Sequence, residues 1–173
     1  MVPGNIGYVE LISFSQNISQ ELQVALRDLQ GKGAVGIVLD VRNNTGGFLR
    51  EATAIVEQFL EGEQLVVYTQ GPAEPKHEYN TSKRKREVCK LPLAILTNNL
   101  SASASEITAG ALQDHKRAVI VGTQSFGKGS VQSVLPLPGN TAIKLTTARY
   151  YTPEGRSIQA KGITPDIVVE ETP

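Results

Sequence analysis

Short apolar runs recur along the chain at the spacing expected of buried β-strands. They are rich in β-branched residues and are bounded by polar or glycine-rich segments, which is typical of strands in a mostly parallel sheet. These runs cover residues 6–12, 33–41, 65–69, 91–97 and 118–122. Between several of them the apolar period changes from two to 3.6 residues, which indicates helices. The pattern therefore predicts strands that alternate with helices.

Three segments carry the helical period. The first, residues 19–30, places Leu22, Leu26 and Leu29 on one face, and the third runs from Ser103 to His115. The second is defined by the spacing of Ala52, Ile55, Val56, Phe59 and Leu60. After residue 130 only strand-like segments and turns follow, over residues 130–135, 141–151 and 163–169. Together these elements predict an α/β fold with a largely parallel central sheet, helices packed on it and a β-rich C-terminal part.

Composition and charge argue against several classes of protein. The 173 residues suffice for one domain with a sizeable core, and 17 Lys+Arg against 17 Asp+Glu leave no net field to attract nucleic acid. No apolar run reaches the roughly 20 residues of a membrane-spanning helix. The single cysteine, Cys89, has no partner for a disulfide or a Cys-type metal site. We therefore expect no nucleic-acid partner, no membrane span, no metal ion and no cofactor.

Residues 71–90 differ from their surroundings. They contain Pro72, Pro75 and the basic run at residues 83–86, with glutamates on both sides of that run. Mixed charge of this kind favours an exposed loop or hairpin over a nucleic-acid patch. We expect little of the core to lie there.

A candidate nucleophile lies where a buried strand is followed by a helix, in residues 101–106 (SASASE). A turn of this kind can expose a hydroxyl near helix N–H groups, which suits a nucleophilic serine at Ser103. Ser103 and Glu106 also have the spacing of a capping box, which is a purely structural alternative. This segment alone leaves both open.

A serine nucleophile needs a base, and the two histidines are poorly placed to act as one. His115 lies at the far end of the same predicted helix, about 18 Å from Ser103 at ~1.5 Å per residue. His77 lies in the polar segment at residues 71–90, where a solvated side chain is expected. A lysine is the remaining candidate.

Lys128 lies in residues 122–130 (GTQSFGKGS), which nearly spell a P-loop. That motif requires Ser or Thr directly after the lysine and then a helix, whereas Gly129 and a strand-like segment follow here, which disfavours nucleotide binding. If Lys128 opens a strand, Gln132 shares its face and can hydrogen-bond the amine. A lysine base also requires desolvation, for which Phe126 and Val131 are the candidates.

Acyl transfer further needs N–H donors for the oxyanion. The candidates are the N–H of Ala104, directly after the serine, and that of Gly46 in residues 43–47 (NNTGG). A plain left-handed turn before the next helix is the alternative for the glycine pair.

Taken together, these segments resemble the carboxyl-terminal processing (tail-specific) serine peptidases, which have a ClpP/crotonase-like α/β core. The resemblance spans about residues 6–169. It is carried by SASASEITAG at 101–110, FGKGSVQ at 126–132, LTTARYYTPEGRSI at 145–158 and GITPDI at 162–167. It implies that Ser103 is the nucleophile, Lys128 the base and Gln132 a residue that positions the lysine. It also implies oxyanion donors at the N–H groups of Gly46 and Ala104, and we expect a structural role for Asp114.

The chain departs from the family pattern in two ways. Thr45 replaces the usual proline before the glycine pair. Family members also carry a PDZ domain ahead of this core, whereas we expect residues 1–173 to form a single peptidase core without one.

The resemblance implies a serine endopeptidase that cleaves disordered or C-terminal segments of proteins through an acyl-enzyme. The substrate would bind as an added strand, and the peptidase could form a homo-oligomer. The alternative is a non-catalytic interaction or scaffold module of such a protease. An extracytoplasmic setting is also implied, either the bacterial periplasm or cell envelope or the thylakoid lumen.

Overall fold

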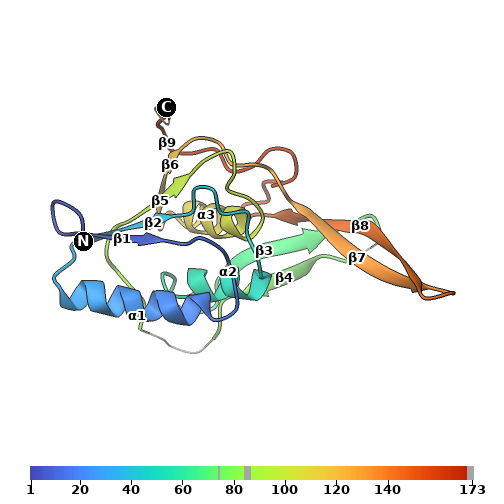
Figure 1. Cartoon of the computed structure of the whole chain (residues 1–173), viewed down its shortest axis with the longest axis horizontal. Helices are drawn as coiled ribbons and strands as arrows, with labels where there is room; N and C mark the ends of the chain where they lie inside the picture. The colour runs from blue at the N-terminus through green and yellow to red at the C-terminus, as the bar shows by residue number, and fades with distance from the viewer. Residues whose placement is uncertain (74, 84–86, 171–173) are drawn as a thin grey trace.

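The computed structural model describes residues 1–73, 75–83 and 87–170 (Figure 1). Its helices are α1 (Ile18–Gly31), α2 (Leu49–Val56) and α3 (Ala104–Asp114). Its strands are β1 (Ile6–Glu10), β2 (Gly36–Asp40), β3 (Leu65–Gln70), β4 (His77–Asn80), β5 (Leu93–Thr97), β6 (Val119–Gly122), β7 (Ser130–Leu137), β8 (Thr141–Tyr151) and β9 (Ile167–Val168).

A parallel sheet forms the centre of the described part of the chain, with the strand order β1-β2-β5-β6-β9. Each crossover adds a strand in the same direction, and right-handed crossovers of this kind place their helices on the same face of the sheet. Helix α2 contacts both α1 and α3, so the helices form one layer. Fully buried side chains fill the space between sheet and helices, among them Ile37, Leu39, Ile55, Ile95, Leu112 and Ile120. The predicted α/β class with a largely parallel sheet is confirmed.

The second sheet is antiparallel, with the order β4-β3-β8-β7. Strand β3 pairs only with the last residues of β8, from Arg149 to Tyr151. Beyond that point β7 and β8 continue as a two-stranded ribbon that extends away from the body of the molecule (Figure 1). The predicted β-rich C-terminal part is therefore present.

The second helix is shorter than its apolar spacing predicts. It ends at Val56, and tighter turns follow in which Gln58 N donates to Ile55 O and Phe59 N to Val56 O, each at 3.0 Å. Phe59 nevertheless stays buried. The apolar period reported which side chains face the core, and the turns continue that burial after the helix has ended.

Residues 71–90 are only partly the exposed hairpin that we expected. Strand β4 pairs with β3 and is largely exposed, and of the described hydrophobic residues in this segment Cys89 alone is buried in the core, so little of the core lies here, as expected. Cys89 N donates to Gln58 O at 2.8 Å, and the guanidinium of Arg117 donates to Leu91 O at 2.8 Å. Burial lowers the pKa of Arg117. Of the basic run, Lys83 is exposed and pairs with Glu63, while residues 84–86 lie outside the described residues.

Candidate active site

Three loops that follow parallel strands meet at one edge of the central sheet. They follow β2, β5 and β6, which are neighbours in the sheet, and the carboxyl ends of neighbouring parallel strands lie side by side. The loop after β2 holds Gly46, the loop after β5 holds Ser103, and the loop after β6 leads to Lys128. The fold therefore gathers the predicted site residues at this edge.

Ser103 has a backbone conformation that residues with a side chain rarely adopt. It links β5 to α3 with φ 57° and ψ −114°, and its side chain is half-buried. Conformations of this kind cost about 1–3 kcal/mol and persist only where the surrounding structure enforces them. Such a strained strand-to-helix turn is the geometry that presents a serine hydroxyl for nucleophilic attack.

Gly46 lies directly against this turn. A Cβ on Gly46 would lie 2.7 Å from both Ser103 Cβ and Ala102 O, and 2.9 Å from the amide nitrogen of Ala104. The φ of Gly46 is +101°, a value that favours glycine. The structure thus brings Gly46, Ser103 and Ala104 together, and only glycine fits at position 46.

Asn44 holds in place the loop of residues 43–47, here called the glycine loop. The sequence alone gave Asn44 no role. Its side chain is fully buried; Nδ2 donates to Leu11 O at 2.5 Å, and Oδ1 accepts from Gly46 N at 2.9 Å. Its carbonyl oxygen accepts from Ala102 N and from the hydroxyl of Ser105. The N–H of Gly46 is therefore engaged with Asn44 in this structure.

Glu106 connects Ser103 to the loop that carries Lys128. Its carboxylate is fully buried, and Oε2 accepts from Ser103 N at 2.8 Å and from Lys128 N at 2.9 Å. Oε1 accepts from Ser125 Oγ and from Gly127 N, both at 2.6 Å. The sequence indicated only the capping bond to Ser103, because the other donors lie 19–22 residues further along the chain.

Lys128 and Gln132 reach the same region but remain in solvent. Both are exposed, and within the described residues Ser103 Oγ, Lys128 Nζ and the Gln132 amide make no hydrogen bonds to one another. Phe126 is 62% exposed and does not enclose the lysine as we had expected. Strand β7 follows Lys128, so the helix that a P-loop requires is replaced by a strand.

The histidines and Asp114 lie elsewhere. His115 ends α3 and its Nε2 lies 2.7 Å from Leu65 O, while His77 is exposed on β4. Asp114 accepts from Glu154 N at 2.8 Å and forms an ion pair with Arg156. Asp114 thus fixes the turn after β8 against the end of α3, which is the structural role we expected.

Asp40, the last residue of β2, supports the start of the glycine loop. Its carboxylate accepts from Tyr8 Oη at 2.7 Å and from both the backbone and the guanidinium of Arg42. Burial alone would raise the pKa of Asp40, but the hydrogen bonds from Arg42 and Tyr8 outweigh it and hold that pKa below its ordinary value. The same bond to Asp40 raises the pKa of Tyr8.

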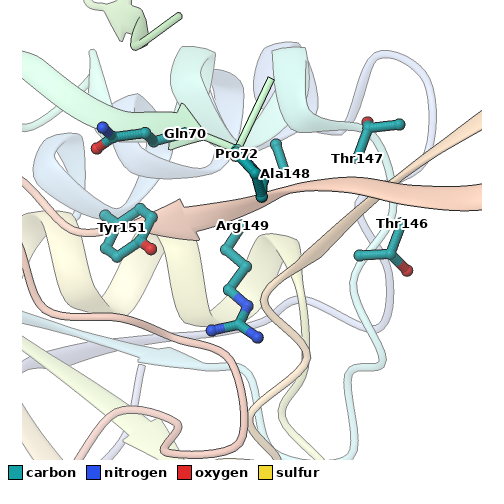
Figure 2. A pocket seen from close by; sticks show the side chains of 8 residues that line it. Gln70, Pro72, Thr146, Thr147, Ala148, Arg149 and Tyr151 are labelled. Atoms are coloured by element: carbon teal, nitrogen blue, oxygen red, sulfur yellow. The ribbon is translucent and has the colours of Figure 1, made fainter. Parts of the chain in front are cut away.

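A cleft of about 550 Å³ lies where β3 separates from β8. Figure 2 shows its lining, in which Gln70 and Pro72 come from the end of β3 and the residues after it, and Thr147, Arg149 and Tyr151 come from β8. None of the predicted site residues lines this cleft. It lies on the β3 side of the ribbon, and β7 is on the opposite side of β8.

Comparison with known proteins assigns the chain to a family. The model of peptidase family S41 matches residues 5–169. The chain belongs to peptidase family S41. The resemblance inferred from the sequence is confirmed, since carboxyl-terminal processing proteases belong to this group.

Individual relatives agree with the family assignment. A carboxy-terminal-processing protease of Bartonella bacilliformis is 50% identical over 98% of this chain, and one of Synechocystis sp. is 43% identical over 98%. These matches cover 40% and 39% of the two relatives, so the chain spans about two fifths of their length. The structure of a photosystem II D1 C-terminal processing protease superposes with a TM-score of 0.87 at 34% identity, covering 98% of this chain and 44% of that one.

One further relative bears on location. A carboxyl-terminal-processing peptidase of Arabidopsis thaliana named as chloroplastic is 38% identical over 93% of this chain and 31% of its own length. Relatives thus occur in both bacteria and chloroplasts. In the part of the chain that the structure describes, no helix is long and apolar enough to cross a membrane.

Proposed function

We propose that this chain is the core of a serine endopeptidase that uses Ser103 and Lys128 as a catalytic dyad. The observation that carries the proposal is the carboxylate of Glu106, because one of its oxygens accepts from both Ser103 N and Lys128 N. Two donors on one oxygen can be no further apart than the sum of their hydrogen-bond lengths. The backbones of the nucleophile and the base are thereby held next to each other in a buried, rigid setting.

The proposed reaction begins with the neutral amine of Lys128. Lys128 Nζ takes the proton of Ser103 Oγ as that oxygen attacks the substrate carbonyl carbon. The peptide C–N bond then breaks, the leaving amine receives the proton from Lys128, and an acyl-enzyme remains on Ser103. Water then attacks the ester carbonyl carbon while Lys128 takes its proton. The bond from that carbon to Ser103 Oγ breaks, Oγ receives the proton from Lys128, and the acid is released.

Two features of the structure must change when substrate binds. Lys128 is exposed, so bound substrate has to exclude water from its amine, and Gln132 on the same strand is the proposed partner that positions it. The N–H of Gly46 donates to Asn44 Oδ1, so it has to turn away from Asn44 to join the N–H of Ala104 at the oxyanion. We propose that both changes accompany binding of an extended segment near the C-terminus of a protein substrate.

The test of the dyad is proteolysis of a disordered protein, with products compared by mass spectrometry. We expect Ser103→Ala and Lys128→Met each to abolish the cleavage seen with the original chain, because each removes one half of the dyad. Cleavage by Lys128→Met at the original rate would exclude the lysine. Loss of cleavage in Lys128→Met but not in Ser103→Ala would exclude the serine.

The exposed lysine and the engaged Gly46 N–H also suit a second candidate, a non-catalytic interaction module of such a protease. Labelling of Ser103 by a serine-directed fluorophosphonate separates the two. Labelling that depends on Lys128 supports the peptidase, whereas a folded protein that neither labels nor cleaves supports the module. An extracytoplasmic location and self-association remain part of the proposal through the family resemblance.

A further inference from the structure

Strand β7 is an edge strand that begins two residues after Lys128. In the described part of the chain the antiparallel sheet has the order β4-β3-β8-β7, so only one side of β7 is paired. The unpaired side presents backbone N–H and C=O groups to solvent. Such an edge is a template for another extended chain.

The register shows which residues of β7 face this free edge. Gly129 O accepts from Tyr150 N at 2.7 Å, so Gly129 faces β8. Backbone groups alternate along a strand, and those of Ser130, Gln132 and Val134 therefore face the other way. The irregularity in the ladder inserts Thr147 into β8 and leaves the alternation of β7 intact.

Pro136 gives independent support for this direction. A proline has no N–H, so within a sheet it is tolerated where its nitrogen faces away from the ladder. Pro136 lies opposite Ala142 and is an even number of residues from Gln132 and Val134. Its nitrogen therefore faces the same way as their N–H groups. It ends the run of edge donors, so the usable part of the edge is short and directly follows Lys128.

The free edge leads to the nucleophile. Lys128 lies two residues before Ser130, and its N–H donates to Glu106 Oε2, which also accepts from Ser103 N. Phe126, two residues earlier, donates its N–H to Ser101 O at 3.0 Å. The start of the β7 edge is thus two residues from a backbone N–H that shares the Glu106 carboxylate with Ser103 N.

The side chains of the ribbon indicate what kind of chain would pair there. On β7, Val134, Leu135 and Leu137 are 63%, 45% and 48% exposed. The only charged residues from 130 to 151 are Lys144 and Arg149. An added strand would place its side chains beside apolar neighbours, which favours an extended, uncharged segment without proline.

We propose that the free edge of β7, from Ser130 to Val134, is the strand onto which the peptidase substrate adds. This inference rests on the proposed function, since it names the element that guides a substrate to Ser103. The added chain pairs with the N–H and C=O groups of Ser130, Gln132 and Val134 and passes Lys128 on its way to the nucleophile. Pro136 sets the far limit of the pairing.

The test compares two substitutions at one position in the Ser103→Ala background, where substrate binds without being cut. Val134→Pro removes an edge N–H without removing a ladder bond, and Val134→Ala removes only the side chain beyond Cβ. Binding of a fluorescein-labelled ten-residue peptide rich in Val, Thr and Ala is followed by anisotropy. We expect the Kd to rise about tenfold more for the proline variant than for the alanine variant.

Amide hydrogen exchange of the Ser103→Ala protein tests the same edge without altering it. Bound peptide should protect the amides of Gln132 and Val134 from exchange. Protection confined to β4, β9 or the cleft at Pro72 would overturn the proposal, as would equal Kd values for the two folded Val134 variants. Because binding is measured without cleavage, the test of the β7 edge does not depend on the dyad. Cleavage that persists in Ser103→Ala would disprove only the dyad.

Discussion

Two regions of the molecule are stabilised in different ways. One is the glycine loop together with Glu106, and the other is the β7–β8 ribbon. Around Ser103, buried side chains of Asn44 and Glu106 bond to backbone groups from several loops. The ribbon, which extends away from the body of the molecule (Figure 1), is held by its own ladder. Its apolar side chains are partly exposed, for example Leu137 at 48% and Leu145 at 41%.

This contrast shows how one small domain can combine rigidity with adaptability. A buried polar group with every bond satisfied fixes a single geometry, because any displacement leaves a donor or acceptor unpaired. A two-stranded ribbon alone is only marginally stable and gains from an added strand. The proposed nucleophile, Ser103, therefore lies in the fixed region, and the proposed substrate strand binds to the adaptable one.

The largest effect is expected at Glu106. In Glu106→Gln the amide NH2 faces donors that the carboxylate accepted, so we expect about 3 kcal/mol less unfolding free energy and at least about 100-fold slower cleavage. Urea unfolding and peptide hydrolysis measure the two losses. Glu21→Gln, in the exposed first turn of α1, is the matched control and should change neither. A Glu106→Gln protein as stable as its control would refute the role of this carboxylate.

A somewhat smaller effect is expected at Asn44. Asn44→Ala leaves Leu11 O and Gly46 N without their partners, which should lower the unfolding free energy by about 2 kcal/mol. Chemical denaturation measures this loss, and Asn99→Ala at an exposed position is the control. If Asn44→Ala unfolds at the same denaturant concentration as the control, the loop does not depend on this side chain.

The pH dependence of stability should show the contribution of Asp40. Its folded-state pKa lies below the unfolded value of about 3.9, so its stabilisation is complete above that value and is lost as the pH falls through the folded-state pKa. We expect Asp40→Asn to remove about 1 kcal/mol at neutral pH and to flatten the decline in stability below pH ~4. Parallel pH profiles of the two proteins in denaturant would contradict this assignment.

The smallest effect is expected on the ribbon. Leu137→Ser at an exposed position of β7 should change the unfolding free energy by no more than about 0.5 kcal/mol. The comparison is Leu39→Ala in the fully buried part of β2, which should cost about 3 kcal/mol. Thermal unfolding of both measures the difference, and a loss at Leu137 as large as that at Leu39 would show that the ribbon packs against the body.

The sequence by itself determined the order of strands and helices, the family and the candidate residues Gly46, Ser103, Ala104, Lys128 and Gln132. The elements follow from local features, because apolar periods report burial and turn residues report backbone conformation. The family and the roles of the candidate residues follow from the resemblance of several ordered motifs. The same local signals overestimated the length of α2, since Phe59 continues the apolar face in a turn. They also underestimated the burial of Cys89.

Only the tertiary structure decided which polar groups meet. Glu106 looked like a capping residue because Ser103 is three residues away, yet its bonds to Gly127 and Lys128 depend on how the loop after β6 folds back. The bond from Asn44 Nδ2 to Leu11 O, the exposure of Lys128 and the free side of β7 have the same origin. Each depends on contacts between segments distant in the chain, and local periodicity carries no information about such contacts.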